Sequence, residues 1–279
     1  MTEELEEEVP EEIIPGVARA LSPLVRRILA SNPSVRTGFG TNTYLVGIDE
    51  IVVIDPGPDD AEHRRSITGC GGDRIRWIML TCGDPEHAAG AEALKAETGA
   101  EILASPKLEG IAVDDTLDDA WTLVGTEFRL KVHYTPGTTP EAISLELPEE
   151  KLLFTGDLVM EGSSMAIVPP HGDMTAYLES LATMKGLRLQ RLAPAHGYVL
   201  EGAKDELQAV IDHRLEREAQ IAAAVGSLDP AGVDAITAEV YGSLDEERHE
   251  LAAATVVAHL QKLLADGTVK ARGGAWLPT

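Results

Sequence analysis

The sequence predicts an α/β (α+β) protein in which a large layered domain precedes a small, mainly helical domain. Up to about residue 205, short apolar runs that end in turn residues alternate with segments of helical periodicity, as in layered α/β domains. Beyond that point the strand pattern fades and helical periodicity dominates. The 279 residues, of which 44% are hydrophobic, are enough to bury a sizeable core.

The strand predictions rest on β-rich runs bounded by turn-forming residues. They cover residues 41–47, 51–57, 75–80, 101–106, 128–137, 142–148, 151–157 and 189–197. Between some of these runs, apolar residues recur at helical spacing. This spacing predicts helices over residues 60–67, 87–97 and 174–184.

The C-terminal region has the pattern of three helices and a hairpin. The helical patterns cover residues 205–225, 228–242 and 250–267, and the hairpin pattern covers residues 268–278. Asp229 is a predicted N-cap with Pro230 at the first helical position, and Gly267 closes the last helix. Adjacent glycines mark the hairpin turn. This arrangement predicts a winged-helix-like domain at residues 206–279, after a layered domain at residues 13–205.

The chain is strongly acidic, with a formal net charge of −24. Such a chain repels phosphate backbones on average, so we expect no nucleic-acid partner. Residues 1–12 are mostly acidic, which predicts a disordered tail and is unlike the basic start of a signal peptide. No run of about 18 or more apolar residues occurs, so we expect no membrane span. Two cysteines make no disulfide framework, and we expect a cytoplasmic protein.

Chemically reactive side chains follow several predicted strands. Asp55 ends one strand, a loop containing Cys82, Asp84, Glu86 and His87 follows the next, and Thr138, Asp157 and His196 follow later ones. Because strand ends of an α/β layer meet at one edge of the sheet, we expect these side chains to share a site.

These motifs together resemble the metallo-β-lactamase superfamily, and more closely its β-lactamase-like hydrolases with a C-terminal winged-helix domain. The resemblance is carried by IDPG, TPG, TGD and a late HG, and by LSPLVRRILASNP, TGFGTNTYLVG, IVPPHGDMTAYLESL and HLQKLLADG. It covers nearly the whole chain except the acidic tail. It implies an αββα sandwich and a metal-dependent hydrolase.

The family's metal loop reads T-H-x-H-x-D-H, whereas residues 81–87 read TCGDPEH. Cys82 and Asp84 therefore stand at two histidine positions, Glu86 at the aspartate position, and His87 at the last histidine position. Thr138 replaces a third histidine, in TPGH. Asp157 matches the bridging aspartate and His196 the final histidine.

The resemblance implies that one of the family's two metal positions has lost its imidazoles. The other keeps a candidate ligand set of Glu86, His87, Asp157 and His196, with Cys82 and Asp84 as further candidates. We expect one divalent ion at most: zinc first, iron or manganese as alternatives, or none. Asp84 and Asp157 are the candidate catalytic carboxylates, with Asp84 placed to act as a general base on water.

Each residue also has a purely structural explanation. Asp55 would cap a turn, Cys82 would be a small buried residue, and His87 would donate to a carboxylate without any ion. Asp84 and Glu86 would be acids at the start of a helix.

Two functions remain open. The first is a hydrolase of an ester, thioester, lactam or phosphodiester with an altered metal centre. The alternative is a catalytically inactive pseudoenzyme or ligand-binding protein of the same fold. In both, the partner is a small-molecule substrate or ligand. We expect the small domain to cover the edge of the site or to form the interface of a homodimer, not to bind DNA.

Overall fold

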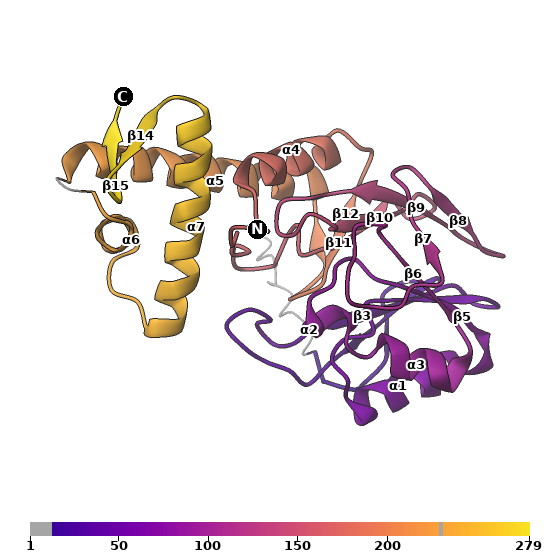
Figure 1. Cartoon of the computed structure of the whole chain (residues 1–279). Coiled ribbons are helices and arrows are strands. Elements are labelled where there is room, and N and C mark those ends of the chain that lie inside the picture. The colour runs from indigo at the N-terminus through magenta and orange to yellow at the C-terminus, as the bar shows by residue number, and fades with distance from the viewer. Residues whose placement is uncertain (1–12, 229–230) are drawn as a thin grey trace, which may run out of the picture.

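The computed structural model describes residues 13–228 and 231–279. The predicted tail at residues 1–12 and the predicted N-cap at Asp229 with Pro230 lie outside them. The predicted αββα sandwich is confirmed: two sheets face each other, and helices cover both outer faces (Figure 1). The winged-helix lobe, yellow in Figure 1, stands beside the sandwich.

The first sheet has seven strands in sequence order. They are β1 (Arg19–Ala20), β2 (Val25–Leu29), β3 (Asn42–Val46), β4 (Ile51–Ile54), β5 (Ile75–Met79), β6 (Glu101–Ala104) and β7 (Asp115–Thr116). The first four pair antiparallel, and β4 to β7 pair parallel. Parallel β4 and β5 therefore end at the same edge, where their following loops meet.

The second sheet has the order β13-β12-β11-β10-β9-β8. Its strands are β8 (Thr122–Val124), β9 (Arg129–Tyr134), β10 (Ile143–Leu147), β11 (Leu152–Gly156), β12 (Arg191–Pro194) and β13 (Leu200–Glu201). β11 and β12 are parallel neighbours, whereas the other pairs are antiparallel. The segments after β11 and β12 thus emerge side by side.

Three apolar layers hold the sandwich together. The middle layer lies between the sheets and contains Tyr44, Ile54, Phe154 and neighbouring aliphatic residues. The outer face of the first sheet packs on α1 (Ala61–Gly71) and α3 (Ala91–Thr98). The outer face of the second sheet packs on α4 (Met174–Lys185) and the start of α5 (Ala203–Ser227).

The C-terminal lobe contains α6 (Val233–Tyr241), α7 (Glu246–Ala265) and a hairpin of β14 (Val269–Arg272) and β15 (Ala275–Pro278). The predicted hairpin is confirmed, and Gly273 and Gly274 at its turn both have positive φ. The second half of α5 packs in the core of this lobe. The predicted domain boundary at residues 205/206 therefore falls within the first turn of α5.

Two sequence predictions differ from the structure. The helix expected over residues 87–97 is two helices, α2 (Pro85–Ala88) and α3, because the chain turns at Gly90, whose N–H donates to the carbonyl oxygen of Gly57 at 2.9 Å. The helix expected to start at residue 230 begins at Val233, after Gly232. Within the described residues, no helix is both long and apolar enough to cross a membrane.

Candidate metal centre

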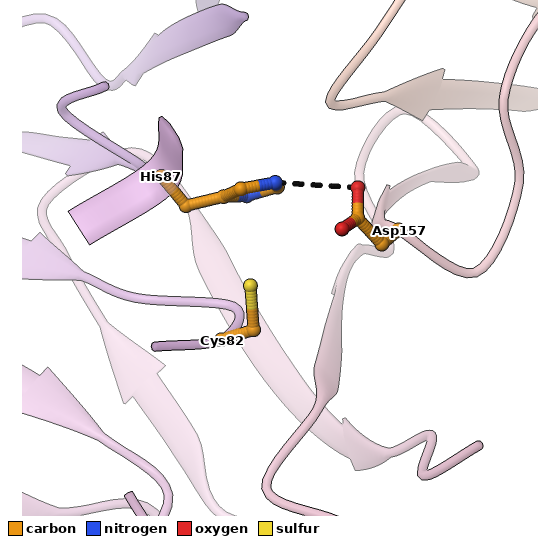
Figure 2. A group of neighbouring side chains, drawn as sticks. All are labelled: Cys82, His87 and Asp157. Atoms are coloured by element: carbon orange, nitrogen blue, oxygen red, sulfur yellow. Dashed lines mark ion pairs between the residues drawn. The ribbon is translucent and has the colours of Figure 1, made fainter. Parts of the chain in front are cut away.

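The site lies where the two sheets present the ends of their parallel strands. Cys82 and His87 come from the loop after β5, and Asp157 comes directly after β11. Their ligand atoms, which are the sulfur, a ring nitrogen and a carboxylate oxygen, all lie within 4.8 Å of one another, and all three residues are buried. Figure 2 shows the His87 imidazole and the Asp157 carboxylate facing each other, with the Cys82 thiol directed into the same space.

A glycine allows the two strand ends to approach. Gly156, the last residue of β11, has a φ of 52°, and a Cβ there would lie 2.8 Å from the Thr81 hydroxyl. Any larger residue would push the loop after β5 away from Asp157. On the other side, Pro85 begins α2 with Asp84 at its N-cap position, and this short helix directs His87 inward.

Asp55 holds the loop and orients His87. Its carboxylate accepts hydrogen bonds from the Thr81 backbone N–H at 2.8 Å and the Thr81 hydroxyl at 2.6 Å. It also pairs with His87 Nδ1 at 2.9 Å. The expectation that Asp55 caps its own turn is therefore wrong, because both of its oxygens are used across the site. With Nδ1 bound to Asp55, His87 presents Nε2 to Asp157.

His196 approaches Asp157 in the same way. Its Nδ1 lies 3.1 Å from the carbonyl oxygen of Gly40, so it donates there and leaves Nε2 as an acceptor. The two Nε2 atoms of His87 and His196 lie 3.2 and 3.3 Å from the same atom, Asp157 Oδ1. The three atoms are buried and lack a hydrogen bond among the described residues.

The electrostatics of the cluster require a positive charge at its centre. Burial opposes the imidazolium of His87, but Cys82, Asp157 and Asp55 around it raise its pKa well above the ordinary 6.5. Burial likewise opposes the carboxylate of Asp157, but His87 and His196 outweigh burial and hold its pKa below 3.8. Two nitrogen lone pairs aimed at one carboxylate oxygen would repel it, so either a proton or a metal cation satisfies the centre.

The donor set fits a divalent ion. Two imidazoles, one carboxylate and one thiol are all ligand types of zinc. Atoms bound about 2.0–2.1 Å from one tetrahedral ion lie roughly 3.3 Å apart, which matches the 3.2 and 3.3 Å separations around Asp157 Oδ1. Burial raises the pKa of the Cys82 thiol to about 11, so a metal would have to displace its proton.

The other two acids of the loop point elsewhere. Arg36 binds both of them: its Nη2 lies 3.1 Å from Asp84 Oδ2, and its Nε lies 3.1 Å from Glu86 Oε1. In this structure Glu86 is therefore outside the group of converging atoms, and the sequence-predicted set is divided. Cys82, His87 and Asp157 form one group, and His196 Nε2 reaches Asp157 Oδ1 at 3.3 Å. Asp84 and Glu86 form a separate ion-pair group with Arg36.

A cavity of about 500 Å³ reaches the centre at Asp157. Its lining includes Asp157, Asp84, Arg36 and Thr138. Burial, and then Glu86 and Asp157, raise the pKa of Asp84 above 3.8 in spite of Arg36. A carboxyl group with a raised pKa beside a buried ligand cluster suits proton transfer.

One residue of the site was missed from the sequence, and the role of another was only partly foreseen. Asp55 was expected at the site from its place in IDPG, but not as the partner of Thr81 and His87. Arg36 gave no signal, because a single arginine in a polar loop has no recognisable spacing to Asp84 or Glu86.

Comparison with known proteins agrees with this architecture. A family model of the Metallo-beta-lactamase superfamily matches residues 36–196, and one of the beta-lactamase associated winged helix domain matches residues 233–276. The chain is 30% identical to a beta-lactamase-like protein 2 homolog of Caenorhabditis elegans, over 90% of this chain and 87% of that one. It is 29% identical to an atrochrysone carboxyl ACP thioesterase of Aspergillus chevalieri, over 84% of this chain and 78% of that one.

Solved structures share the fold at low sequence identity. A metallo-beta-lactamase family protein from Thermus thermophilus superposes with a TM-score of 0.79 at 18% identity, covering 93% of this chain and all of that one. A beta-lactamase domain protein from Burkholderia ambifaria gives a TM-score of 0.82 at 16% identity, covering 96% of each chain. The chain therefore belongs to the metallo-β-lactamase superfamily and carries a beta-lactamase associated winged helix domain.

Proposed function

We propose that this protein is a hydrolase of small acyl esters or thioesters that works with a single divalent ion, zinc in the first instance. The observation that carries the proposal is the convergence of His87 Nε2, His196 Nε2 and Asp157 Oδ1, buried and without hydrogen bonds among the described residues. Relatives named as acyl-carrier-protein thioesterases support the acyl class.

Some residues of the site would bind the ion, and another would transfer a proton. His87, His196 and Asp157 would hold the ion, with Cys82 as a fourth ligand. A bound divalent ion polarises a carbonyl oxygen and makes water nucleophilic near neutral pH. Asp84 lines the cavity beside Asp157 and would take the proton from the attacking water, while Asp55 keeps His87 in its binding orientation.

The alternative is a ligand-binding protein without turnover. It is favoured by the ion pair of Asp84 with Arg36, which engages the carboxylate that lines the cavity. Thr138, which also lines the cavity, adds no imidazole.

Measurements of metal content and then of substrate hydrolysis distinguish the hydrolase from the ligand-binding protein. Full-length protein would be incubated with zinc, manganese or ferrous iron, desalted, and analysed by mass spectrometry. Thioesters of N-acetylcysteamine with short and medium acyl chains, and the matching esters, would then be tested. Asp157→Ala removes the shared ligand, and Asp73→Ala is the matched control, because Asp73 is exposed in the turn before β5.

We expect about one ion per chain in the wild type and in Asp73→Ala. Asp157→Ala should bind no ion and have no turnover. Metal without turnover of any substrate would favour the binding protein. Absence of metal under every condition would overturn the metal centre itself.

A further inference from the structure

A second cavity, of about 430 Å³, lies between the sandwich and the winged-helix lobe. One side is formed by loops of the sandwich, and the other by α5 and α7. It shares Arg36, Met165, Ala166 and Val168 with the cavity of the metal centre, so the two spaces are neighbours.

The lining of this cavity is cationic in a chain whose net charge is −24. Among the described residues that line it there is no Asp or Glu, but there are four arginines: Arg36, Arg214, Arg217 and Arg248. Arg36 and Arg248 are compensated, because Arg36 binds Asp84 and Glu86, and Arg248 binds Asp245. Arg214 and Arg217 have no carboxylate within ion-pair distance in the described part of the chain.

Arg214 is only 2% exposed, yet it lacks a counter-ion among the residues described. It donates to the Met165 carbonyl oxygen and lies over the Tyr177 ring, 5.1 Å from its centroid. Its Nε is buried and has no acceptor among the described residues. A buried guanidinium without an anion is costly, so this position favours a bound anion.

Arg217 repeats the arrangement one turn further along α5. It lies 4.3 Å from the centroid of the Tyr241 ring and donates to the Val240 carbonyl oxygen at 3.0 Å and to Gln220 at 2.8 Å. Its Nε is likewise buried, with no acceptor in the described part of the chain. Aromatic stacking fixes the plane of each guanidinium, and a fixed plane suits carboxylate or phosphate oxygens.

His213 lies beside the same two arginines, Arg214 and Arg217. Its Nδ1 lies 3.1 Å from the hydroxyl of Ser164. Burial, and then the charges of Arg214 and Arg217, lower its pKa below 6.5. His213 is therefore neutral at pH 7 and adds a hydrogen-bonding group to the cavity.

We infer that this cavity binds an amphiphilic organic anion, a carboxylate or a phosphate monoester that carries an apolar chain. Arg214 and Arg217 would hold the anionic group, and apolar lining residues such as Val35, Leu244 and Leu251 would contact the chain. The binding itself does not depend on metal or turnover. The anion could also be one end of a substrate whose acyl bond lies at the metal centre. Only this additional step rests on the proposed function.

Calorimetric titration with octanoate, octyl phosphate and octylammonium tests the inference on full-length protein, with and without added zinc. We expect both anions to compete for one site and to bind at least about tenfold more tightly than octylammonium, with or without zinc. The tighter of the two anions identifies the head group. If neither anion binds, or if octylammonium binds equally well, the inference is wrong.

Variants locate the site. Arg217→Gln should weaken anion binding by about tenfold or more, whereas Arg217→Lys should retain part of it. Arg65→Gln, an exposed arginine on α1, is the matched control and should bind as the wild type does. Wild-type affinity in Arg217→Gln, with unchanged thermal unfolding, would overturn the assignment. Zinc content measured on the same samples separates this inference from the metal centre, because anion binding without metal leaves it standing.

Discussion

The loop after β5 has two faces that behave differently. Cys82 and His87 turn inward, are at most 2% exposed, and face Asp157. Asp84 and Glu86 turn away from this group and share the exposed guanidinium of Arg36, while Asp84 also lines the cavity beside Asp157. The difference arises because Asp84 is the N-cap position of a helix that begins at Pro85, so that His87 lies on the buried side of the first turn. Whether a side chain of this loop can reach the metal centre therefore depends on the local backbone conformation. Its position in the family motif does not decide this.

Substituting one residue from each face should give the largest difference between the two faces. His87→Ala should lower zinc occupancy by at least about tenfold, because it removes a buried ligand. It should also cost about 2–4 kcal/mol of stability, since Asp55 and Asp157 lose their shared partner. Glu86→Ala should keep its zinc. Mass spectrometry and urea unfolding give both quantities. Loss of zinc in Glu86→Ala would show that the outward face turns inward when the ion binds.

A second buried histidine provides the contrast for His87. His63 on α1 bonds to the Thr43 hydroxyl at 2.8 Å, and burial lowers its pKa to about 4. The unfolded chain therefore binds more protons than the folded chain between pH 6.5 and about 4, so stability falls as the pH falls through this window. His63 should contribute up to ~3 kcal/mol to that loss.

Urea unfolding of His63→Gln at pH 7 and pH 4.5 measures this contribution. The variant should lose less stability between the two pH values than the wild type does. His171→Gln is the control, because His171 is exposed. If the pH dependence is unchanged in His63→Gln, the environment of this histidine is not the one described.

The thiol of the inward face should be almost unreactive without metal. With the pKa of Cys82 raised by burial to about 11, its thiolate fraction at pH 8 is about a hundredfold below that at the ordinary 9.0, equivalent to ~2.7 kcal/mol. Iodoacetamide should label the half-buried Cys70 far faster than Cys82. Peptide mass spectrometry over a time course reads both sites. Equal labelling rates would mean that the loop opens readily.

The outward face should matter least for stability. Arg36 is about half exposed, so Arg36→Gln should change the free energy of unfolding by less than about 1 kcal/mol. Zinc occupancy should stay at the wild-type level. Unfolding at low and high salt measures the effect, which should shrink as salt screens the pairs. A destabilisation of several kcal/mol would show that the ion pairs hold the loop.

Much of the fold was predictable because the hydrophobic periodicity of a segment and the turn-forming residues at its ends indicate the same element. The runs that became β3, β4, β5 and β11 end in turn residues, and the hairpin around Gly273 and Gly274 has its signal within a few residues. β2 was not predicted, because Arg26 and Arg27 interrupt its apolar pattern. In the fold Arg27 is only 4% exposed, and Arg26 bonds to the carbonyl oxygen of Gly47. Tertiary contacts, and not the local sequence pattern, therefore stabilise β2 as a strand.

The site was predictable as a group of residue types but not as a geometry. Strand ends indicated that His87, Asp157 and His196 would lie near one another. Nothing in the sequence indicated that Gly156 would let the two sheets approach, or that Arg36 would hold Asp84 and Glu86 from 48 and 50 residues away. Those features depend on long-range contacts, which local periodicity does not contain.

Helix α5 runs unbroken from the sandwich into the winged-helix lobe (Figure 1). Its helical rotation therefore sets the direction in which Arg214 and Arg217 point at the second cavity. Its first turns pack beneath the second sheet, whereas Arg214 and Arg217 lie further along the same rod. One residue inserted between these parts would rotate everything beyond it by about 100°. Such an insertion would turn Arg214 and Arg217 away from the second cavity, so the lining of this cavity depends on the exact length of α5.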